Sequence, residues 1–158
     1  MEMTLNSLQT HALALASEFA RQKPVQLDVA WSNEEVAKDR NSLEFKLPRQ
    51  TGSSLICHFL CHEFDCLTVL PNQYMLDDFL AEHKKLFPDH QPKLTTIYAL
   101  KRETNLICKE FDHLKMISDA LRTSKVVLFD AFRVYSDNSA VRKLMHELGR
   151  SHRFIIFK

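Results

Sequence analysis

The chain has 158 residues, of which 45% are hydrophobic and 26% are charged, and its net charge is +1. This length fits one domain with a sizeable core, and the composition excludes a disordered chain. The near-zero charge argues against direct binding to nucleic acid, and no apolar run approaches the roughly 18 residues of a membrane span. With four unevenly spaced cysteines and no signal-peptide pattern, we expect a cytoplasmic protein.

The first 42 residues predict a helix followed by a strand, added to the N-terminal side of a core at 43–158. Apolar residues recur at helical spacing at Leu5, Leu8, Ala12, Leu15 and Phe19. Pro24 ends this helix, and apolar and polar residues alternate over 25–31 as in a half-exposed strand. The charged stretch 32–41 is expected to be a connector or a short helix. This N-terminal part is expected either to extend the sheet or to mediate a homodimer through a strand edge.

The rest of the chain alternates between strand-like and helix-like segments. We expect strands at 43–47, 66–71, 94–100, 125–129 and 154–157. The expected helices cover 54–64, 72–87, a segment through 106–121, and 136–148. This alternation predicts a single α/β domain, residues 1–158, with a mainly parallel sheet and helices on both faces.

The two glycines of the chain are expected where the backbone is unusual. Gly149 follows an apolar helical pattern, which predicts a left-handed helix end. Gly52 lies between a strand-like and a helix-like stretch, where glycine permits a tight turn.

Gly52 also belongs to a stretch, "LPRQTGSSL", that is similar to a phosphate-binding loop, G-x-x-x-x-G-K-[ST]. Gly52 and the hydroxyl of Ser54 match that pattern, but Leu47 replaces the first glycine and Ser53 replaces the lysine. Lys46 or Arg49 is a candidate substitute for the lost charge. The sequence leaves three interpretations open: a non-catalytic remnant, a real nucleotide site, and coincidence.

A second nucleotide-site element is the strand "VVLFDAF". Asp130 follows its apolar run, as the Mg²⁺-binding aspartate does in such proteins, but Ala131 stands where a water-activating glutamate is usual. Both departures remove catalytic charge and leave the architecture, so we expect a fold of this kind without hydrolysis and without a cofactor.

The stretch "CHFLCHEFDC" is a candidate zinc site. Cys57 and Cys61 are four residues apart, as are His58 and His62, so each pair shares a helical face. Two further ligands would have to come from elsewhere, and the candidates are Cys66, Cys108 and His113. The alternative is that the cysteines pack as small buried residues and the histidines lie at the polar edge.

Two charged regions have simple explanations. Asp77, Asp78 and Glu82 are expected on a solvated helix face. The basic C-terminal residues form either a solvated face or a surface for an acidic partner: Arg142, Lys143, Arg150, His152, Arg153 and Lys158. A cysteine–histidine nucleophile has its ingredients in the chain but no spacing motif.

Short motifs after residue 43 resemble the SulA family of SOS-induced cell-division inhibitors. "ALRTS", at 120–124, is similar to a family motif, A-L-R-[ST]-G, that closes a helix before a buried strand. "TVLPNQYMLDDF" is similar to a family strand that ends in a proline turn, with an aromatic residue eight positions later, here Pro71 and Phe79. The chain departs from the family at Phe64, Asp65 and Cys66, where an Arg–aromatic pair is frequent, and it lacks the family's C-terminal tail after "FIIFK".

The resemblance implies a RecA-like fold that has lost its nucleotide chemistry, and a protein that is not an enzyme. It implies binding to FtsZ, the tubulin-like division GTPase, at its polymerisation surface, and inhibition of septation after DNA damage. The implied contact residues are Val69, Pro71, Tyr74, Phe79 and Thr96. For Val69 and Phe79 core packing is an equal alternative, and Tyr74 is expected to be the most exposed.

Two other functions remain open. "LPRQTGSS" is also similar to the phosphate loop of phage terminase ATPases, in which case Arg49 would stabilise phosphate charge and Asp130 would hold Mg²⁺. The third is a zinc-stabilised adaptor built on the Cys/His helix.

Overall fold

The sheet of the protein is entirely parallel. The computed structural model describes residues 4–25, 31–47, 52–99, 120, 123–130 and 139–158. Five strands pair in the order β1-β5-β4-β2-β3, and every pair is parallel. Their bounds are β1 Ser42–Phe45, β2 Leu67–Leu70, β3 Lys93–Thr96, β4 Val126–Phe129 and β5 Arg153–Phe157. This confirms the predicted α/β class.

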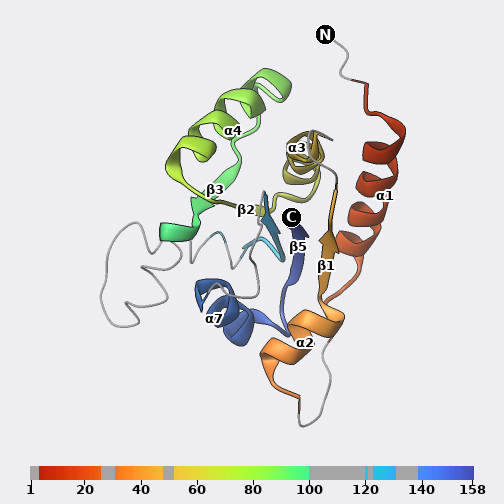
Figure 1. The fold of residues 1–158 in the computed structure, drawn as a ribbon, viewed down its shortest axis with the longest axis vertical. Helices are drawn as coiled ribbons and strands as arrows, with labels where there is room; N and C mark the ends of the chain where they lie inside the picture. Colours follow the sequence, from red (N-terminus) through yellow and green to blue (C-terminus); the bar gives the residue numbers. More distant parts are fainter. Residues whose placement is uncertain (1–3, 26–30, 48–51, 100–119, 121–122, 131–138) are drawn as a thin grey trace.

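Helices cover the sheet on both faces (Figure 1). Helices α1 (Ser7–Arg21), α3 (Ser53–Phe64) and α4 (Gln73–Leu86) pack on one face, and their side chains form one core with the sheet. Helices α2 (Asn33–Arg40) and α7 (Ser139–Leu148) pack on the other face and form a second core. Among the helices that the structure describes, none combines the length and apolarity needed to cross a membrane.

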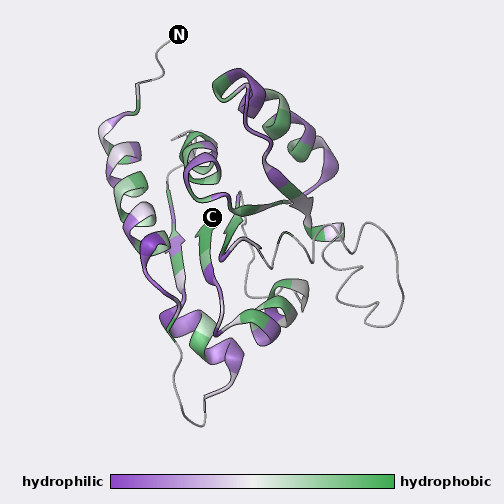
Figure 2. Cartoon of the chain, turned by 180° about the vertical axis from the view of Figure 1, so that it is seen from behind, coloured by the Kyte–Doolittle hydropathy of each residue, from purple (hydrophilic) through white to green (hydrophobic). Residues whose placement is uncertain are grey.

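The central strands are apolar on both sides because they face two cores. In β4, Val126 and Leu128 join the core under α1, α3 and α4, whereas Val127 and Phe129 join the core under α2 and α7. All four residues are buried. Figure 2 shows the same contrast, with hydrophobic central strands and helices of mixed hydropathy around them. A continuous apolar run is what a parallel strand covered on both faces requires.

Polar residues define where several helices begin. The side chain of Asn6 accepts a hydrogen bond from the backbone of Gln9, and Ser32 does the same for Glu35. Asn72 accepts from the Met75 backbone at the start of α4. Such caps satisfy amide groups that the first turn of a helix leaves unbonded.

The buried side of α1 differs from the predicted one. Leu8 and Leu15 are 44% and 62% exposed, whereas Ala12 and Ala16 are buried against α3. The helical period was right, and Ala12 and Phe19 of the predicted apolar face belong to the core, but the expected burial of Leu8 and Leu15 was wrong. Alanines let α1 approach α3 closely, and the longer leucines lie outside that contact.

Three predicted segments differ from the structure or lie outside it. The expected strand 25–31 falls mostly in 26–30, outside the described residues, and the backbone of Val25 bonds to the side chain of Asn41 instead of to a strand. β3 ends at Thr96, because residues 97–99 are already helical. The helix expected through 106–121 also lies outside the described residues, apart from residue 120.

The two glycines serve different purposes. Gly52 has φ +71° and is left-handed, which confirms the unusual backbone expected there. Gly149 does not have a positive φ, so the left-handed helix end predicted for it is wrong. A β-carbon at Gly149 would overlap the carbonyl oxygens of Asn33 and Met145. Glycine is needed there because the start of α2 lies directly against the end of α7.

We therefore expect Gly149→Ala to destabilise the protein by about 1–3 kcal/mol, since the methyl group meets two rigid backbone oxygens. Gly52→Asn is the matched control and should cost less than about 1 kcal/mol, because asparagine tolerates a left-handed backbone and its β-carbon would meet only the flexible end of the Gln9 side chain. Urea unfolding of both variants measures the difference. Equal costs would contradict the assigned role of Gly149.

Candidate functional site

One residue from each candidate nucleotide-site element, Ser54 and Asp130, meets the other at the carboxyl edge of the sheet. Ser54 lies in the first turn of α3, and Asp130 directly follows β4. The Ser54 hydroxyl donates a hydrogen bond to Oδ2 of Asp130 over 3.1 Å, although 76 residues separate them in the sequence. Asp130 is 1% exposed, and its backbone N–H donates to the carbonyl of Val69. In a nucleotide-binding protein these two side chains would be the Mg²⁺ ligands.

The strand order makes this edge the natural place for a ligand. From β2 the chain moves outward through α4 to β3, whereas from β4 it moves the other way through α7 to β5. The two helices therefore leave adjacent strands toward opposite faces. Open parallel sheets bind ligands at such a crossing point, outside the carboxyl ends of the strands. Asp130 lies at this point.

Gly52 positions the start of α3 beside this carboxylate. Its carbonyl accepts a hydrogen bond from Nε2 of Gln9, which ties the turn to α1. Unlike α1, α2 and α4, helix α3 has no side-chain cap. Of the two candidate substitutes for the lysine, Lys46 is exposed and Arg49 lies outside the described residues, as does Ala131.

The cysteines of the predicted zinc stretch are buried, and burial favours their protonated form. Burial raises the pKa of Cys57 well above its usual range, and the charge of Asp130 raises it further. Burial raises the pKa of Cys61 to about 11 and also raises the pKa of Cys66. Thiols with raised pKa values are poor nucleophiles and must lose a proton before they bind a metal. Two of them, Cys57 and Cys66, belong to the core under α3.

The histidines of that stretch separate from the cysteines. His58 is fully buried and contacts His83 of α4, so its expected place at the polar edge is wrong. His62 is exposed and stacks on Phe87, with ring centroids 4.1 Å apart. In the described part of the chain, no three or more His, Cys, Asp or Glu side chains are arranged to hold a metal ion. Cys108 and His113 lie outside that part.

The implied partner-binding residues divide into core and surface. Val69, Phe79 and Thr96 are buried, at 0%, 4% and 7% exposure, whereas Pro71 is half-buried. Tyr74 is 75% exposed, as expected.

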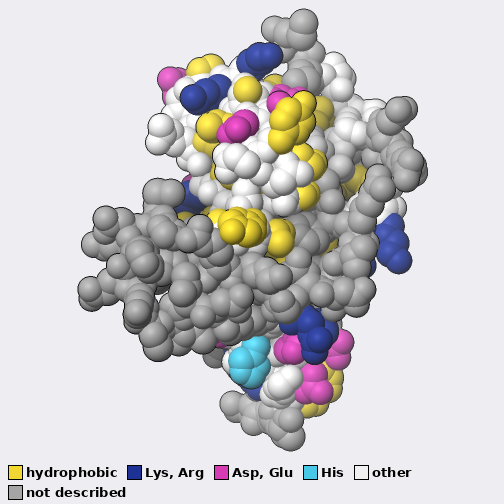
Figure 3. Space-filling view, turned by 60° about the vertical axis from the view of Figure 1, so that its left-hand side comes forward, with side chains coloured by type: hydrophobic (Ala, Val, Ile, Leu, Met, Phe, Trp, Pro, Cys, Tyr) yellow, Lys and Arg dark blue, Asp and Glu magenta, His cyan; other side chains and the backbone are white. Residues whose placement is uncertain are grey.

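Tyr98, which the sequence did not single out, is also 69% exposed. Because Leu70 pairs with Thr96 at the ends of β2 and β3, Tyr74 and Tyr98 both follow the same edge of the sheet. Figure 3 shows this side of the molecule, where hydrophobic side chains reach the surface over α4 among charged ones.

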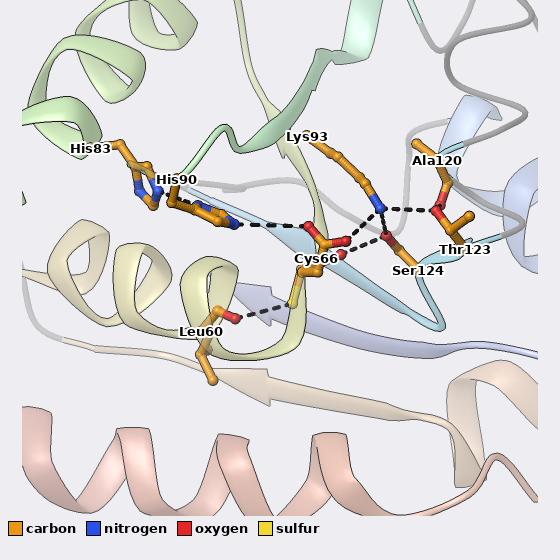
Figure 4. Close-up of polar contacts among 9 residues, drawn as sticks. Leu60, Cys66, His83, His90, Lys93, Ala120, Thr123 and Ser124 are labelled. Atoms are coloured by element: carbon orange, nitrogen blue, oxygen red, sulfur yellow. Dashed lines mark hydrogen bonds and ion pairs between the residues drawn. The ribbon is translucent and has the colours of Figure 1, made fainter. Parts of the chain in front are cut away.

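The ALRTS motif lies at the opposite, amino edge. The carbonyl of Ala120 accepts from the Ser124 backbone over 2.8 Å and from the Thr123 hydroxyl over 3.3 Å. The Lys93 ammonium donates to the Thr123 and Ser124 hydroxyls and pairs with Asp65 over 2.6 Å (Figure 4). These contacts join the starts of β2, β3 and β4, so Thr123 and Ser124 have a structural role, whereas residues 121–122 of the motif lie outside the described residues.

The charged regions match their simple explanations only in part. Asp77, Asp78 and Glu82 are exposed, as predicted for a solvated helix face. At the C-terminus, His152 and Arg153 are buried instead of solvated. The Arg153 guanidinium donates to the carbonyls of Arg40 and Lys23 and lies over the ring of Phe19.

Comparison of the chain with protein-family models, with curated proteins and with solved structures finds no match.

We expect Ser54→Ala to destabilise the protein by about 1–3 kcal/mol, because it removes a hydrogen bond to a buried carboxylate. Ser53→Ala is the matched control, since the Ser53 hydroxyl makes no hydrogen bond to the described residues. Thermal unfolding at neutral pH compares the two. Similar losses would contradict the importance of the Ser54–Asp130 bond.

Proposed function

We propose that this protein is a non-catalytic protein-binding inhibitor, built on a RecA-like scaffold, whose docking surface lies at the carboxyl edge of the sheet around Tyr74. The observation that carries the proposal is the exposure of Tyr74, an aromatic side chain that is 75% accessible at the first turn of α4. Aromatic residues in this position are typical anchors of protein interfaces.

The surroundings of Tyr74 fit an anchor with a polar rim. Asn72 and Gln73 are exposed beside it, and Tyr98 supplies a second exposed ring at the same edge. Val69 and Phe79 belong to the two cores, so they support this surface from below instead of contacting a partner. The proposed contact set is therefore Pro71, Tyr74 and Tyr98.

The candidate nucleotide site supports a function without hydrolysis. Ser53 occupies the position of the charge that binds the β- and γ-phosphates, and Asp130 is already hydrogen-bonded to Ser54. Phosphoryl transfer depends almost entirely on positioned positive charge, so a loop without its lysine is poorly equipped for it.

The partner that the sequence resemblance favours is FtsZ, and the biological setting that goes with it is the block of septation during the SOS response. Sequestration of monomers fits a small protein that presents an exposed aromatic surface, here Tyr74 and Tyr98, to a polymerisation surface. We expect the purified chain to lower the amount of FtsZ that sediments with GTP.

Tyr74→Ala should weaken this inhibition at least about tenfold, because an interface anchor contributes about 2 kcal/mol or more. Leu15→Ala is the matched control: Leu15 is 62% exposed on α1, away from the proposed surface, and its loss should leave inhibition unchanged. FtsZ pelleting at increasing inhibitor concentration measures both. Unchanged pelleting with excess native protein would reject the FtsZ proposal, and equal inhibition by native and Tyr74→Ala protein would reject the surface.

Nucleotide binding, as in a relative of phage terminase ATPases, is the second candidate, favoured by the 3.1 Å contact between Ser54 and Asp130. The test is thermal unfolding with and without MgATP, using Asp130→Asn as the matched variant. On the leading proposal MgATP leaves the unfolding temperature unchanged. A rise of several degrees that Asp130→Asn abolishes would support the second candidate instead.

A further inference from the structure

Three histidines form a continuous chain between α3 and α4. Nδ1 of His58 lies 3.0 Å from Nδ1 of His83, and Nε2 of His83 lies 2.8 Å from Nδ1 of His90. His58 belongs to α3, His83 to α4, and His90 to the segment after α4. Figure 4 shows His83 and His90 side by side, on the way to the Lys93 cluster. Both nitrogens of His83 are therefore engaged by another imidazole.

A carboxylate stands at each end of this chain. Nε2 of His58 is 3.5 Å from Oε2 of Glu82, and Nε2 of His90 is 3.9 Å from Oδ1 of Asp65. The end contacts are longer than the two between imidazoles. Nε2 of His58 is fully buried and has no hydrogen-bond partner among the described residues.

The other groups that face the chain are few. His62 of α3 lies with its ring centroid 5.1 Å from that of His90, and Lys93 of β3 pairs with Asp65. Phe79 of α4 stacks on His58, with ring centroids 3.9 Å apart. The ring centroids of Phe87 and His83 are 5.2 Å apart. Among the described residues, the charged groups near the trio are thus Glu82 and Lys84 from α4, of which Lys84 lines one pocket with His90, Asp65 from the turn before β2, and Lys93 from β3.

The number of protons that this chain can hold is fixed by its geometry. Three neutral imidazoles carry one N–H each, and the chain has four links: two between imidazoles and one to each carboxylate. With three protons, both short N···N links are filled and one end link is empty. A fourth proton fills the last link. A fifth would place two N–H groups against each other and break a short link.

We propose that the His58–His83–His90 chain is an acid-operated release for α4, which accepts one added proton and separates from α3 when a second one binds. The two short N–H···N bonds and the ring stacking hold the end of α4 against α3 in the neutral state. A second added proton removes one of those bonds and puts two positive charges in the same buried site. This inference does not depend on the proposed partner or on the nucleotide loop.

The direction of the pH effect follows from where protons bind more easily. Burial lowers the pKa of His58 and of His83 to about 4, against an ordinary value of 6.5. Neighbouring histidines lower the pKa of His83 further. The folded state therefore gains stability from these groups above pH 6.5, and that stability is lost as the pH falls from 6.5 toward 4, because the unfolded chain takes up the protons first.

The size of the effect follows from the same count. The unfolded chain binds three added protons at these positions and the folded chain binds one, so the difference reaches two. Each proton of difference changes the folding equilibrium constant tenfold per pH unit. The folding equilibrium constant of the native protein should therefore fall by up to about 100-fold per pH unit because of these three histidines.

The test compares urea unfolding at pH 7.5, 6.5, 5.5 and 4.5 for the native chain, His83→Asn and His146→Asn. His146 is an exposed histidine on α7, behind the opposite face of the sheet, and serves as the matched control. Between pH 6.5 and 4.5 the folding constant of the native protein should fall at least about tenfold more than that of His83→Asn. His146→Asn should follow the native protein. Equal pH dependence of all three would overturn the proposal.

Hydrogen exchange of the native protein gives a second reading that needs no variant. Protection factors of amides in α4 should fall between pH 6.5 and 4.5, whereas those in α7 should be retained. The reason is that the three histidines join α4 to α3 and do not contact α7. Parallel loss of protection in α4 and α7 would also overturn the proposal, whether or not His83→Asn folds.

Discussion

The buried amide of Asn41 joins three segments that are far apart in the sequence. Its side chain accepts a hydrogen bond from the backbone of Val25 over 2.8 Å, and donates to the carbonyls of Val25 over 3.1 Å and of Gly149 over 2.7 Å. It thereby ties the segment after α1 and the end of α7 to the start of β1. Arg153, on the neighbouring strand β5, makes a similar contact: its guanidinium donates a hydrogen bond to the carbonyl of Arg40 at the end of α2. Helix ends favour such a cation because their last carbonyls are unpaired.

The two edges of the sheet have different roles. The amino edge carries the polar contacts that join strands and helices: Asn41 and Arg153 at β1 and β5, and the Lys93–Asp65 pair at β3 and β2. The carboxyl edge carries Ser54 and Asp130, together with the exposed Tyr74. Because the contacts at the amino edge stabilise the fold, residues at the carboxyl edge can change without loss of these contacts. That arrangement is general in open α/β sheets, in which function lies beyond the carboxyl ends of the strands.

The sequence predicted properties of single segments better than contacts between segments that are far apart in the chain. The alternation of strand-like and helix-like segments predicted a mainly parallel sheet with helices on both faces, which the structure has, but the contact between Ser54 and Asp130 was not predicted. The exposure of Leu8 and Leu15 on α1 was missed because the hydrophobic period identifies a helix but not which neighbour it meets, and alanines pack more closely than leucines. Gly149 was misread because its need is a contact with α2, 116 residues away from it at Asn33. The contacts among the three histidines were missed for the same reason. His58 was singled out in the sequence, but its contact with His83, and through His83 with His90, exists only because α4 packs on α3.

The loop around Gly52 matches a phosphate loop at two positions that also have a structural role in this protein. A glycine with a left-handed backbone and a serine in the first turn of α3 shape the turn and bond it to β4, and both tasks persist without any ligand. A lysine in such a loop has only one role, since its charge serves phosphate and contributes nothing to the turn. Loss of nucleotide binding would therefore remove the lysine first and leave the glycine and the serine in place. On the proposal of a non-catalytic remnant, Ser53 beside Gly52 and Ser54 is therefore the expected combination.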